Sequence, residues 1–266
     1  MKTAVATICI GSKNQAMRRL TFPSIIDFAE GIGADFVNMS QTFGDRFGGI
    51  LNYEKLQFIN LLEIYDRIIY LDADILVSRE CPNPIDQVPP HSIGAFITSR
   101  YSSLHNHTNL EIIRALGDIE WQRESRDDSI LESFNSGVLV LSKQLLPALK
   151  QALPAADAWC QYSRKAKPHT LLKDQPVLNY ITQKNCIPIH DLSYRFNHTN
   201  ARGGSADRFA SYVIHYAGVS HRQESRRFKT TKLEKMKIDA KILSIPWLHR
   251  LAKKSPRLVR VLDSFV

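Results

Sequence analysis

Short apolar segments alternate with segments of helical pattern along most of the chain, and this alternation restricts the fold more than any other feature of the sequence. Strand-like runs occur at residues 3–10, 34–39, 67–77, 92–98, 136–142 and 211–218. The intervening segments place apolar residues at helical spacing, as Leu56, Ile59 and Leu62 do in YEKLQFINLLEIY. Such alternation favours one α/β domain with a mostly parallel central sheet flanked by helices.

Helix boundaries follow from local signals. NQAMRRL and SIIDFAEGIG are expected to form two helical pieces, because Pro23 is suited to the first turn of the second. Further helices are predicted after Lys143 and after Asp174. Two polar, turn-rich stretches, 99–133 and 162–173, have no clear pattern, and we expect insertions of this kind to shape a substrate pocket.

Two aspartates interrupt the most apolar of the strand-like runs, RIIYLDADILV. Asp72 and Asp74 are two residues apart, so at the end of a strand their side chains lean the same way while Ala73 points elsewhere. Two ionised carboxylates in a partly buried place repel each other unless a cation compensates for their charge. Hard oxygen ligands suit Mn²⁺ or Mg²⁺, so the pair predicts a divalent metal site.

The net charge of +9 is concentrated at the carboxyl end. Residues 222–266 contain thirteen Lys and Arg against four Asp and Glu, whereas residues 1–221 contain 22 of each. The four cysteines show no metal-ligand spacing, and the N-x-T sequons at Asn106 and Asn197 are interpreted as chance. No apolar run reaches the ~20 residues of a spanning helix, and we expect a cytoplasmic chain.

Five segments resemble, in order, those of glycosyltransferase family 8, which includes glycogenin and bacterial lipopolysaccharide glycosyltransferases. They are EKLQ, YLDADILV, FNSGVLVL, DQPVLN and VIHYAG, and together they extend from Glu54 to Gly218. The resemblance implies a GT-A type nucleotide-diphospho-sugar transferase fold over residues 1–221. It also implies a retaining, Mn²⁺- or Mg²⁺-dependent enzyme of lipopolysaccharide biosynthesis. Such an enzyme moves a hexose from UDP-glucose or UDP-galactose to a saccharide or lipid-linked acceptor.

The resemblance also assigns roles to individual residues. Asp72, Asp74 and His215 match the family's metal ligands, and Asp174 and Gln175 match an acidic pair at the reacting centre, with an amide in the second place here. The donor-binding residues that it implies are Thr7, Cys9, Lys55, Asp72, Ala73, Asp74, Asn135, Ser136, Gly218, His221 and Arg222. Whether Asp174, Gln175 or the acceptor serves the reacting face is left open.

Two positions depart from the family pattern. A tyrosine that stacks on uracil in many members is replaced here by Asn14 or Gln15, which leaves the base of the donor open. A phosphate-binding lysine is replaced by His221 and Arg222, of which Arg222 carries a permanent charge.

Simpler interpretations compete with these roles. Lys55 could be a solvated charge, His215 a core histidine, FNSG a turn and Asp174 a helix N-cap. The run DADIL also resembles the pattern of HAD-like aspartate phosphatases, but Leu76 stands in its last position and the pair lies far from the first strand. A non-enzymatic role, in which the basic tail binds nucleic acid, lacks any recognisable module.

The basic extension, residues 222–266, has its own pattern. Pro246 and Pro256 suit the first turns of two short helices, each with an apolar stripe and a basic face. The apolar residues are Trp247, Leu248, Leu251, Leu258, Leu262 and Phe265. Two alternatives are open: the stripe docks on the body of the protein, or it attaches the chain peripherally to an anionic membrane surface at the inner membrane face.

Overall fold

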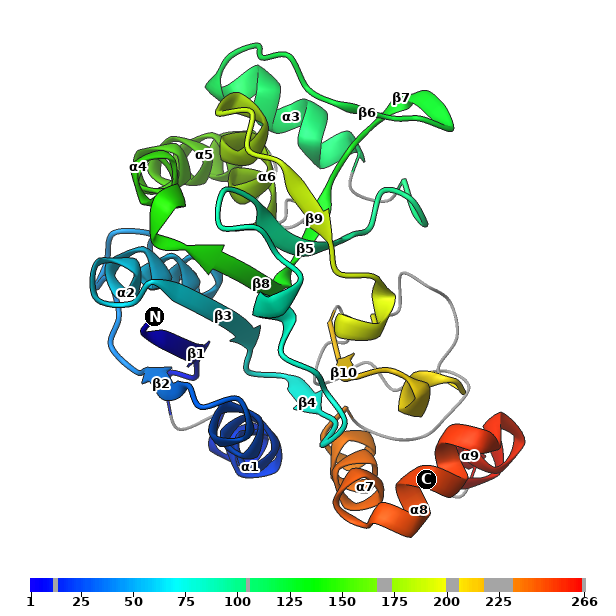
Figure 1. Ribbon diagram of the computed structural model, residues 1–266. Coiled ribbons are helices and arrows are strands. Elements are labelled where there is room, and N and C mark those ends of the chain that lie inside the picture. Colours follow the sequence, from blue (N-terminus) through cyan, green and yellow to red (C-terminus); the bar gives the residue numbers. More distant parts are fainter. Residues whose placement is uncertain (12–13, 104–105, 167–173, 200–205, 218–231, 265–266) are drawn as a thin grey trace.

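The computed structural model describes residues 1–266 except 12–13, 104–105, 167–173, 200–205, 218–231 and 265–266. Its centre is a six-stranded sheet of order β2-β1-β3-β8-β5-β9 (Figure 1). These strands are β1 (Thr3–Ile8), β2 (Asp35–Met39), β3 (Arg67–Asp72), β5 (Ile93–Ile97), β8 (Phe134–Ser142) and β9 (Ile189–Asp191). Three of the pairings are parallel, and β8 runs antiparallel to both of its neighbours. The α/β class and the mostly parallel sheet are therefore confirmed.

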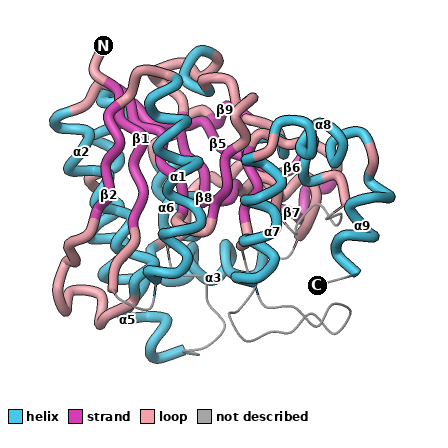
Figure 2. The backbone as a smooth tube through the Cα atoms, turned by 90° about the horizontal axis from the view of Figure 1, so that it is seen from below, coloured by secondary structure: helices cyan, strands magenta, loops and turns pink. Residues whose placement is uncertain are grey.

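Helices cover both faces of this sheet, as the views along two directions show (Figures 1 and 2). Ile68 and Tyr70 of β3 belong to one core cluster, and Ile69 and Leu71 belong to the other, as the two-residue period of a strand requires. The first cluster is covered by α2 (Phe58–Ile64), α3 (Asn106–Leu116), α4 (Leu146–Leu149), α5 (Ala152–Ala166) and α6 (Gln175–Lys184). On the second face lies α1 (Gln15–Gly31).

The first helix differs from the expectation of two pieces. α1 is one continuous helix with Pro23 inside it, and side-chain hydroxyls bond to backbone carbonyls around the proline. Thr21 Oγ1 donates to the carbonyl of Met17 at 3.1 Å, and Ser24 Oγ donates to that of Thr21 at 2.9 Å. Burial of Ile25 and Phe28 in the second core cluster favours the continuous helix over the break that proline alone would favour.

The segment around EKLQ is also only partly as predicted. A 3-10 helix, η2 (Leu51–Gln57), precedes α2, so the helical pattern begins as a tighter turn. Four consecutive residues of η2, Tyr53 to Leu56, are buried, so this turn is enclosed by the protein on all sides. Lys55 is thereby turned into the protein.

A separate short antiparallel ribbon follows the carboxyl end of β3. It consists of β4 (Ile75–Val77) and β10 (Val213–His215), with η5 (Tyr194–Phe196) leading toward it. The unassigned stretch 99–133 contains α3 and a small hairpin of β6 (Arg123–Glu124) and β7 (Asp127–Leu131). Short 3-10 turns at Pro84–Asp86, Lys143–Leu145 and Arg208–Ala210 complete the described structure.

The extension forms three helices, α7 (Lys232–Ser244), α8 (Pro246–Lys254) and α9 (Pro256–Ser264), and the last two start at the prolines as predicted. Their inward residues, Met236, Ile242, Leu243, Ala252 and Val259, share a core cluster with Leu76, Phe209 and Ile214 of the body. Asp239 of α7 accepts hydrogen bonds from the buried Arg208 guanidinium at 2.7 Å and from the Tyr216 hydroxyl at 2.6 Å. The extension is therefore packed on the body.

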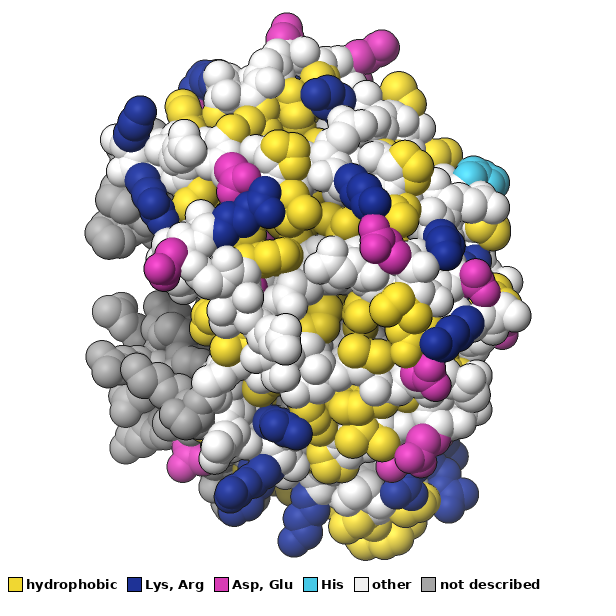
Figure 3. Space-filling view, turned by 90° about the vertical axis from the view of Figure 1, so that its left-hand side faces the viewer, with side chains coloured by type: hydrophobic (Ala, Val, Ile, Leu, Met, Phe, Trp, Pro, Cys, Tyr) yellow, Lys and Arg dark blue, Asp and Glu magenta, His cyan; other side chains and the backbone are white. Residues whose placement is uncertain are grey.

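Surface charge on the body is balanced, in line with its sequence. On the side that lies to the left in Figure 1, acidic and basic side chains are interspersed among apolar ones (Figure 3). None of the helices in the described residues is long and apolar enough to cross a bilayer.

Candidate active site

The two aspartates lie where β3 ends and the ribbon begins. Asp72 is the last residue of β3, Ala73 and Asp74 form a turn, and β4 follows at Ile75. Because His215 of β10 pairs directly with Ile75, the ribbon places the histidine next to the turn. A tight turn between two buried strands thus presents both carboxylates to one side, opposite an imidazole.

The expected convergence of Asp72, Asp74 and His215 is confirmed. One ligand atom from each lies within 4.8 Å of the others, and His215 Nε2 is 3.3 Å from Asp74 Oδ1 and 3.6 Å from Asp72 Oδ2. The carboxylates are partly exposed, whereas the side chain of His215 is 2% exposed. Two carboxylates and an imidazole form an oxygen and nitrogen donor set that fits Mn²⁺, and fits Mg²⁺ when water completes its shell.

Lys55 is a buried ion-pair partner and not a solvated charge. Its Nζ is 3.0 Å from Asp72 Oδ1 and 2.9 Å from Asp174 Oδ2, and the residue is only 4% exposed. Burial disfavours its charged form, but the carboxylates of Asp174 and Asp72 outweigh burial and raise the pKa of Lys55 above its usual value. The ammonium therefore stays protonated and binds the end of β3 to the start of α6.

Asp174 occupies the N-cap position of α6, but its side chain makes no capping hydrogen bond. Its Oδ2 instead accepts a hydrogen bond from Ser136 Oγ at 2.6 Å and pairs with Lys55. The interpretation of Asp174 as a simple N-cap is therefore wrong, because the carboxylate is turned away from the helix and toward β8. Ser136 also lies 3.2 Å from Lys55 Nζ, so the three side chains form one buried cluster.

The amides of Asn135 and Gln175 adjoin this cluster. Asn135 Nδ2 donates to Gln175 Oε1 at 3.2 Å, and Asn135 Oδ1 accepts from the backbone N–H of Gly137 at 2.9 Å. A methyl group on Gly137 would lie 2.1 Å from Cε1 of His215, so only glycine leaves room for the ring. FNSG is thus more than a turn, because it determines where His215 lies.

Of the donor-binding residues expected near the first strand, Thr7 lies in β1 and Cys9 follows it, and both are buried. Thr7 of β1 is fully buried, pairs with Leu71 of β3, and its Oγ1 has no hydrogen-bond partner among the described residues. Burial raises the pKa of the Cys9 thiol, which points to the carbonyl of Asn14 at 3.8 Å. Asn14 itself donates to the carbonyl of Ile10 at 2.8 Å.

Three donor-binding residues implied by the resemblance, Gly218, His221 and Arg222, lie outside the described residues. Two contacts were missed by the sequence analysis. Lys232 of α7 is 2.7 Å from Asp74 Oδ2, although nothing distinguishes it among the neighbouring lysines of KLEKMK. Asn197 contacts His215 at 2.8 Å, and the only sequence pattern that includes Asn197 is an N-x-T sequon.

The environment of Asp74 explains how two carboxylates tolerate each other here. Burial opposes its ionisation, but His215 and Lys232 outweigh burial and hold the pKa of Asp74 below its usual value. Each aspartate therefore has its own lysine, with Lys55 beside Asp72 and Lys232 beside Asp74.

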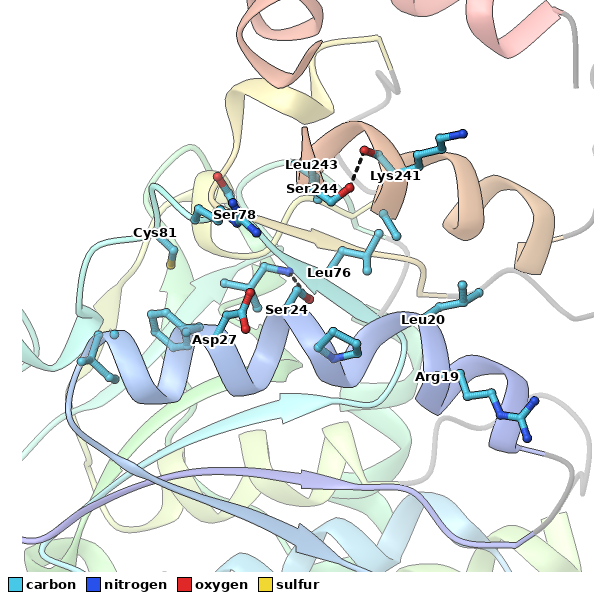
Figure 4. A pocket seen from close by; sticks show the side chains of 17 residues that line it. Arg19, Leu20, Ser24, Asp27, Leu76, Ser78, Cys81, Lys241, Leu243 and Ser244 are labelled. Atoms are coloured by element: carbon cyan, nitrogen blue, oxygen red, sulfur yellow. Dashed lines mark hydrogen bonds between the residues drawn. The ribbon is translucent and has the colours of Figure 1, made fainter. Parts of the chain in front are cut away.

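A groove of about 700 Å³ lies away from these residues, between α1, β4 and α7 (Figure 4). Its floor is apolar, with Leu20, Pro23, Leu76 and Leu243, and Ser24 Oγ accepts from the backbone N–H of Val77 at 3.2 Å. None of the site residues expected from the sequence lines it. The expected metal ligands and donor-binding residues that the structure describes therefore lie outside this groove.

Comparison with known proteins gives a consistent picture. Residues 13–221 match the model of the family described as glycosyl transferase family 8. A search of curated proteins found no match to the chain. Among solved structures, the fold is similar to that of a glycosyltransferase involved in the glycosylation of the major capsid of PBCV-1. The identity is 12%, the match covers 90% of this chain and 100% of that one, and the TM-score is 0.52.

Two structures of the galactosyltransferase LgtC are also similar. The complex with donor and acceptor sugar analogues has 16% identity over 91% of this chain and 96% of that one, with a TM-score of 0.52. An active-site mutant of LgtC has 16% identity over 90% and 95% of the two chains, with a TM-score of 0.56. At these identities the likeness establishes the fold alone, which is the GT-A fold.

The buried position of Lys55 leads to a stability prediction. Lys55→Met leaves Asp72 and Asp174 without their shared cation, and we expect the free energy of unfolding to fall by about 3 kcal/mol or more. Urea denaturation measures the change. Lys150→Met is the matched control, because Lys150 pairs with Glu63 on the surface at 2.8 Å. It should leave the free energy nearly unchanged, and equal effects of the two substitutions would contradict the buried pair.

Proposed function

The chain belongs to glycosyl transferase family 8, and we propose that it transfers a hexose from a nucleotide sugar to a saccharide or lipid-linked acceptor, with retention of configuration and with Mn²⁺ or Mg²⁺. The observation that most supports this proposal is that Asp72, Asp74 and His215 converge beside the buried cluster of Lys55, Ser136 and Asp174. We take residues 1–221 as the catalytic domain and 222–266 as an extension packed on it. Lipopolysaccharide biosynthesis is the setting that fits such an acceptor.

The three converging residues would hold the divalent cation. Bound there, the cation supplies positive charge to the departing nucleotide diphosphate. Lys232 brings a second positive charge to the same place, 2.7 Å from Asp74, and could turn from the carboxylate to a phosphate oxygen. Lys232 would then bind the diphosphate of the donor together with Gly218, His221 and Arg222, the other proposed donor-binding residues.

Asp174 and Gln175 form the part of the site that would hold the hexose of the donor, called the sugar side below. The Asp174 carboxylate accepts from Ser136 and pairs with Lys55, and these two contacts fix its orientation. A carboxylate held in this way suits electrostatic stabilisation of positive charge at C1 of the donor better than covalent attack. Gln175, whose Oε1 accepts from Asn135, would position hydroxyl groups of the hexose.

UDP-glucose and UDP-galactose are the donors we propose first, since the similar structure LgtC is a galactosyltransferase. Neither alternative function gains support from the geometry. The phosphatase pattern places its nucleophile on the first strand of the domain, whereas Asp72 is the last residue of β3. A nucleic-acid role for the tail still lacks any recognisable module.

The exposed face of the last helices favours a membrane surface near the acceptor. Trp247, Arg250, Leu251 and Lys254 have helical spacing on the outer face of α8, opposite the buried His249 and Ala252. Trp247 is 64% exposed and Leu251 is 46% exposed. Large apolar side chains among cations suit an anionic bilayer surface, to which each cation contributes about 1 kcal/mol.

This face is connected directly to the site. α7 begins at Lys232, beside Asp74, and ends at Ser244, just before α8. Thirteen helical residues extend about 20 Å, so an acceptor held at the bilayer by its lipid would be within reach of the carboxylates. We therefore propose a cytoplasmic enzyme that attaches peripherally to the inner membrane face.

Metal-dependent cleavage of the donor tests the proposed reaction. Donor hydrolysis is measured with UDP-glucose, UDP-galactose and other nucleotide sugars, before and after removal of divalent metal and after return of Mn²⁺. Asp72→Asn should lower the rate about 100-fold or more. Asp66→Asn, at the other end of β3 and exposed, should not change it. Release of nucleotide by the metal-free protein at an undiminished rate would exclude the mechanism.

Vesicle binding tests the membrane face. Arg250→Glu should lower co-sedimentation with anionic vesicles at least fivefold, as expected for a loss of about 1 kcal/mol or more, and salt should weaken binding of the unchanged chain. Arg114→Glu on α3 makes the same charge change at an exposed position far from α8 and is the control (Figure 1). Binding that is indifferent to lipid charge, or equally sensitive to both substitutions, would contradict the assignment.

A further inference from the structure

Asn197 lies at the centre of a hydrogen-bond chain that joins the sugar side of the site to the metal ligands. It follows η5, and backbone bonds between His198 and β10 hold it beside His215: His198 N–H donates to the carbonyl of Val213 at 3.0 Å, and His215 N–H donates to that of His198 at 3.1 Å. The Asn197 side chain is fully buried. Both of its polar atoms have partners, Asn135 and His215.

The direction of every hydrogen bond in this chain is fixed by one backbone group. The N–H of Gly137 can only donate, so the atom of Asn135 that it contacts at 2.9 Å is the acceptor Oδ1. The Asn197 atom that also contacts this oxygen, at 2.8 Å, must be the amide nitrogen. The remaining Asn197 atom is therefore its oxygen, which can only accept. The hydrogen of the 2.8 Å contact with His215 consequently resides on Nδ1.

This polarity matters because of where the other ring nitrogen points. Nε2 of His215 is the atom that faces Asp74 at 3.3 Å and Asp72 at 3.6 Å. With one hydrogen held on Nδ1, Nε2 is the nitrogen that faces the carboxylates, and a cation bound between them would replace any hydrogen there and take its lone pair. The close approach of Gly137 to the ring, which excludes even a methyl group, fixes the ring from its other side.

We propose that Asn197 is a positioning residue of the metal site, which holds His215 in the tautomer and orientation that direct Nε2 toward Asp72 and Asp74. The proposal rests on the metal site of the proposed function and adds to it the residue that sets the imidazole. Through Asn135 the same chain reaches Gln175, so the metal and sugar sides of the site share one set of hydrogen bonds. Full burial also excludes Asn197 of the folded chain as a glycosylation acceptor.

Direct titration with Mn²⁺ tests the proposal without relying on catalysis. The metal-free full chain and its variants are titrated by calorimetry, and thermal melting establishes that each variant is folded. Asn197→Ala removes the acceptor for Nδ1–H, and we expect the affinity for Mn²⁺ to fall about 10- to 100-fold. Asn197→Asp keeps an oxygen acceptor at the same place and should bind Mn²⁺ much more tightly than Asn197→Ala does.

A double-mutant cycle separates positioning from a merely structural effect. If Asn197 acts through His215, adding Asn197→Ala to His215→Ala should cause no further loss of Mn²⁺ affinity. Asn109→Ala is the matched control, because Asn109 is equally buried but lies on α3, away from the site, and should leave the affinity unchanged.

Three results would overturn the proposal. Unchanged Mn²⁺ affinity in Asn197→Ala, with a loss in His215→Ala, would show that Asn197 does not position the ligand. Additive losses in the double variant would show that Asn197 acts through another group. Unchanged affinity in Asp72→Asn and His215→Ala would remove the metal site itself, and so would contradict the proposed function together with the inference.

Discussion

The ammonium of Lys55, buried between two carboxylates, is the interaction on which the arrangement of the site depends. It lies 3.0 Å from Asp72 at the end of β3 and 2.9 Å from Asp174 at the start of α6, and Ser136 of β8 completes its surroundings. One cation thus joins three elements that are far apart in the sequence. Because removal of either partner would leave a buried charge unpaired, the geometry of the strand ends is coupled to the stability of the fold.

A second layer of contacts places the remaining site residues relative to this cluster. Gly137 leaves room for the His215 ring, and Asn135 and Asn197 pass hydrogen bonds from Gln175 to the imidazole. Lys232 of α7 compensates for the charge of Asp74. The extension is therefore part of the site as well as a packed appendage, since its first helix begins with a residue that touches a predicted metal ligand.

Sequence pattern alone was sufficient for five of the six strands of the central sheet and for the carboxylate pair, because apolar runs and an acidic pair within one of them are local signals; it missed the short strand β9 and the hairpin of β6 and β7. It was wrong for α1, where burial of Ile25 and Phe28 overrides the proline. For Asp174 it left a helix cap and a site residue as alternatives, and the side chain pairs with Lys55 and does not cap its helix. Lys232 and Asn197 left no local signal at all. Their roles come from tertiary contacts at separations of 158 and 18 residues, which no spacing rule describes.

The proposed reaction requires that Asp72, Asp74 and Nε2 of His215 share one divalent cation. The most direct measurement is anomalous diffraction from crystals of the full chain grown with Mn²⁺ and a nucleoside diphosphate. We expect one Mn²⁺ peak about 2.0–2.6 Å from an oxygen of each aspartate and from Nε2, with Nδ1 still bonded to Asn197. A peak coordinated through Nδ1, or bound without His215, would show that the three residues do not form this metal site.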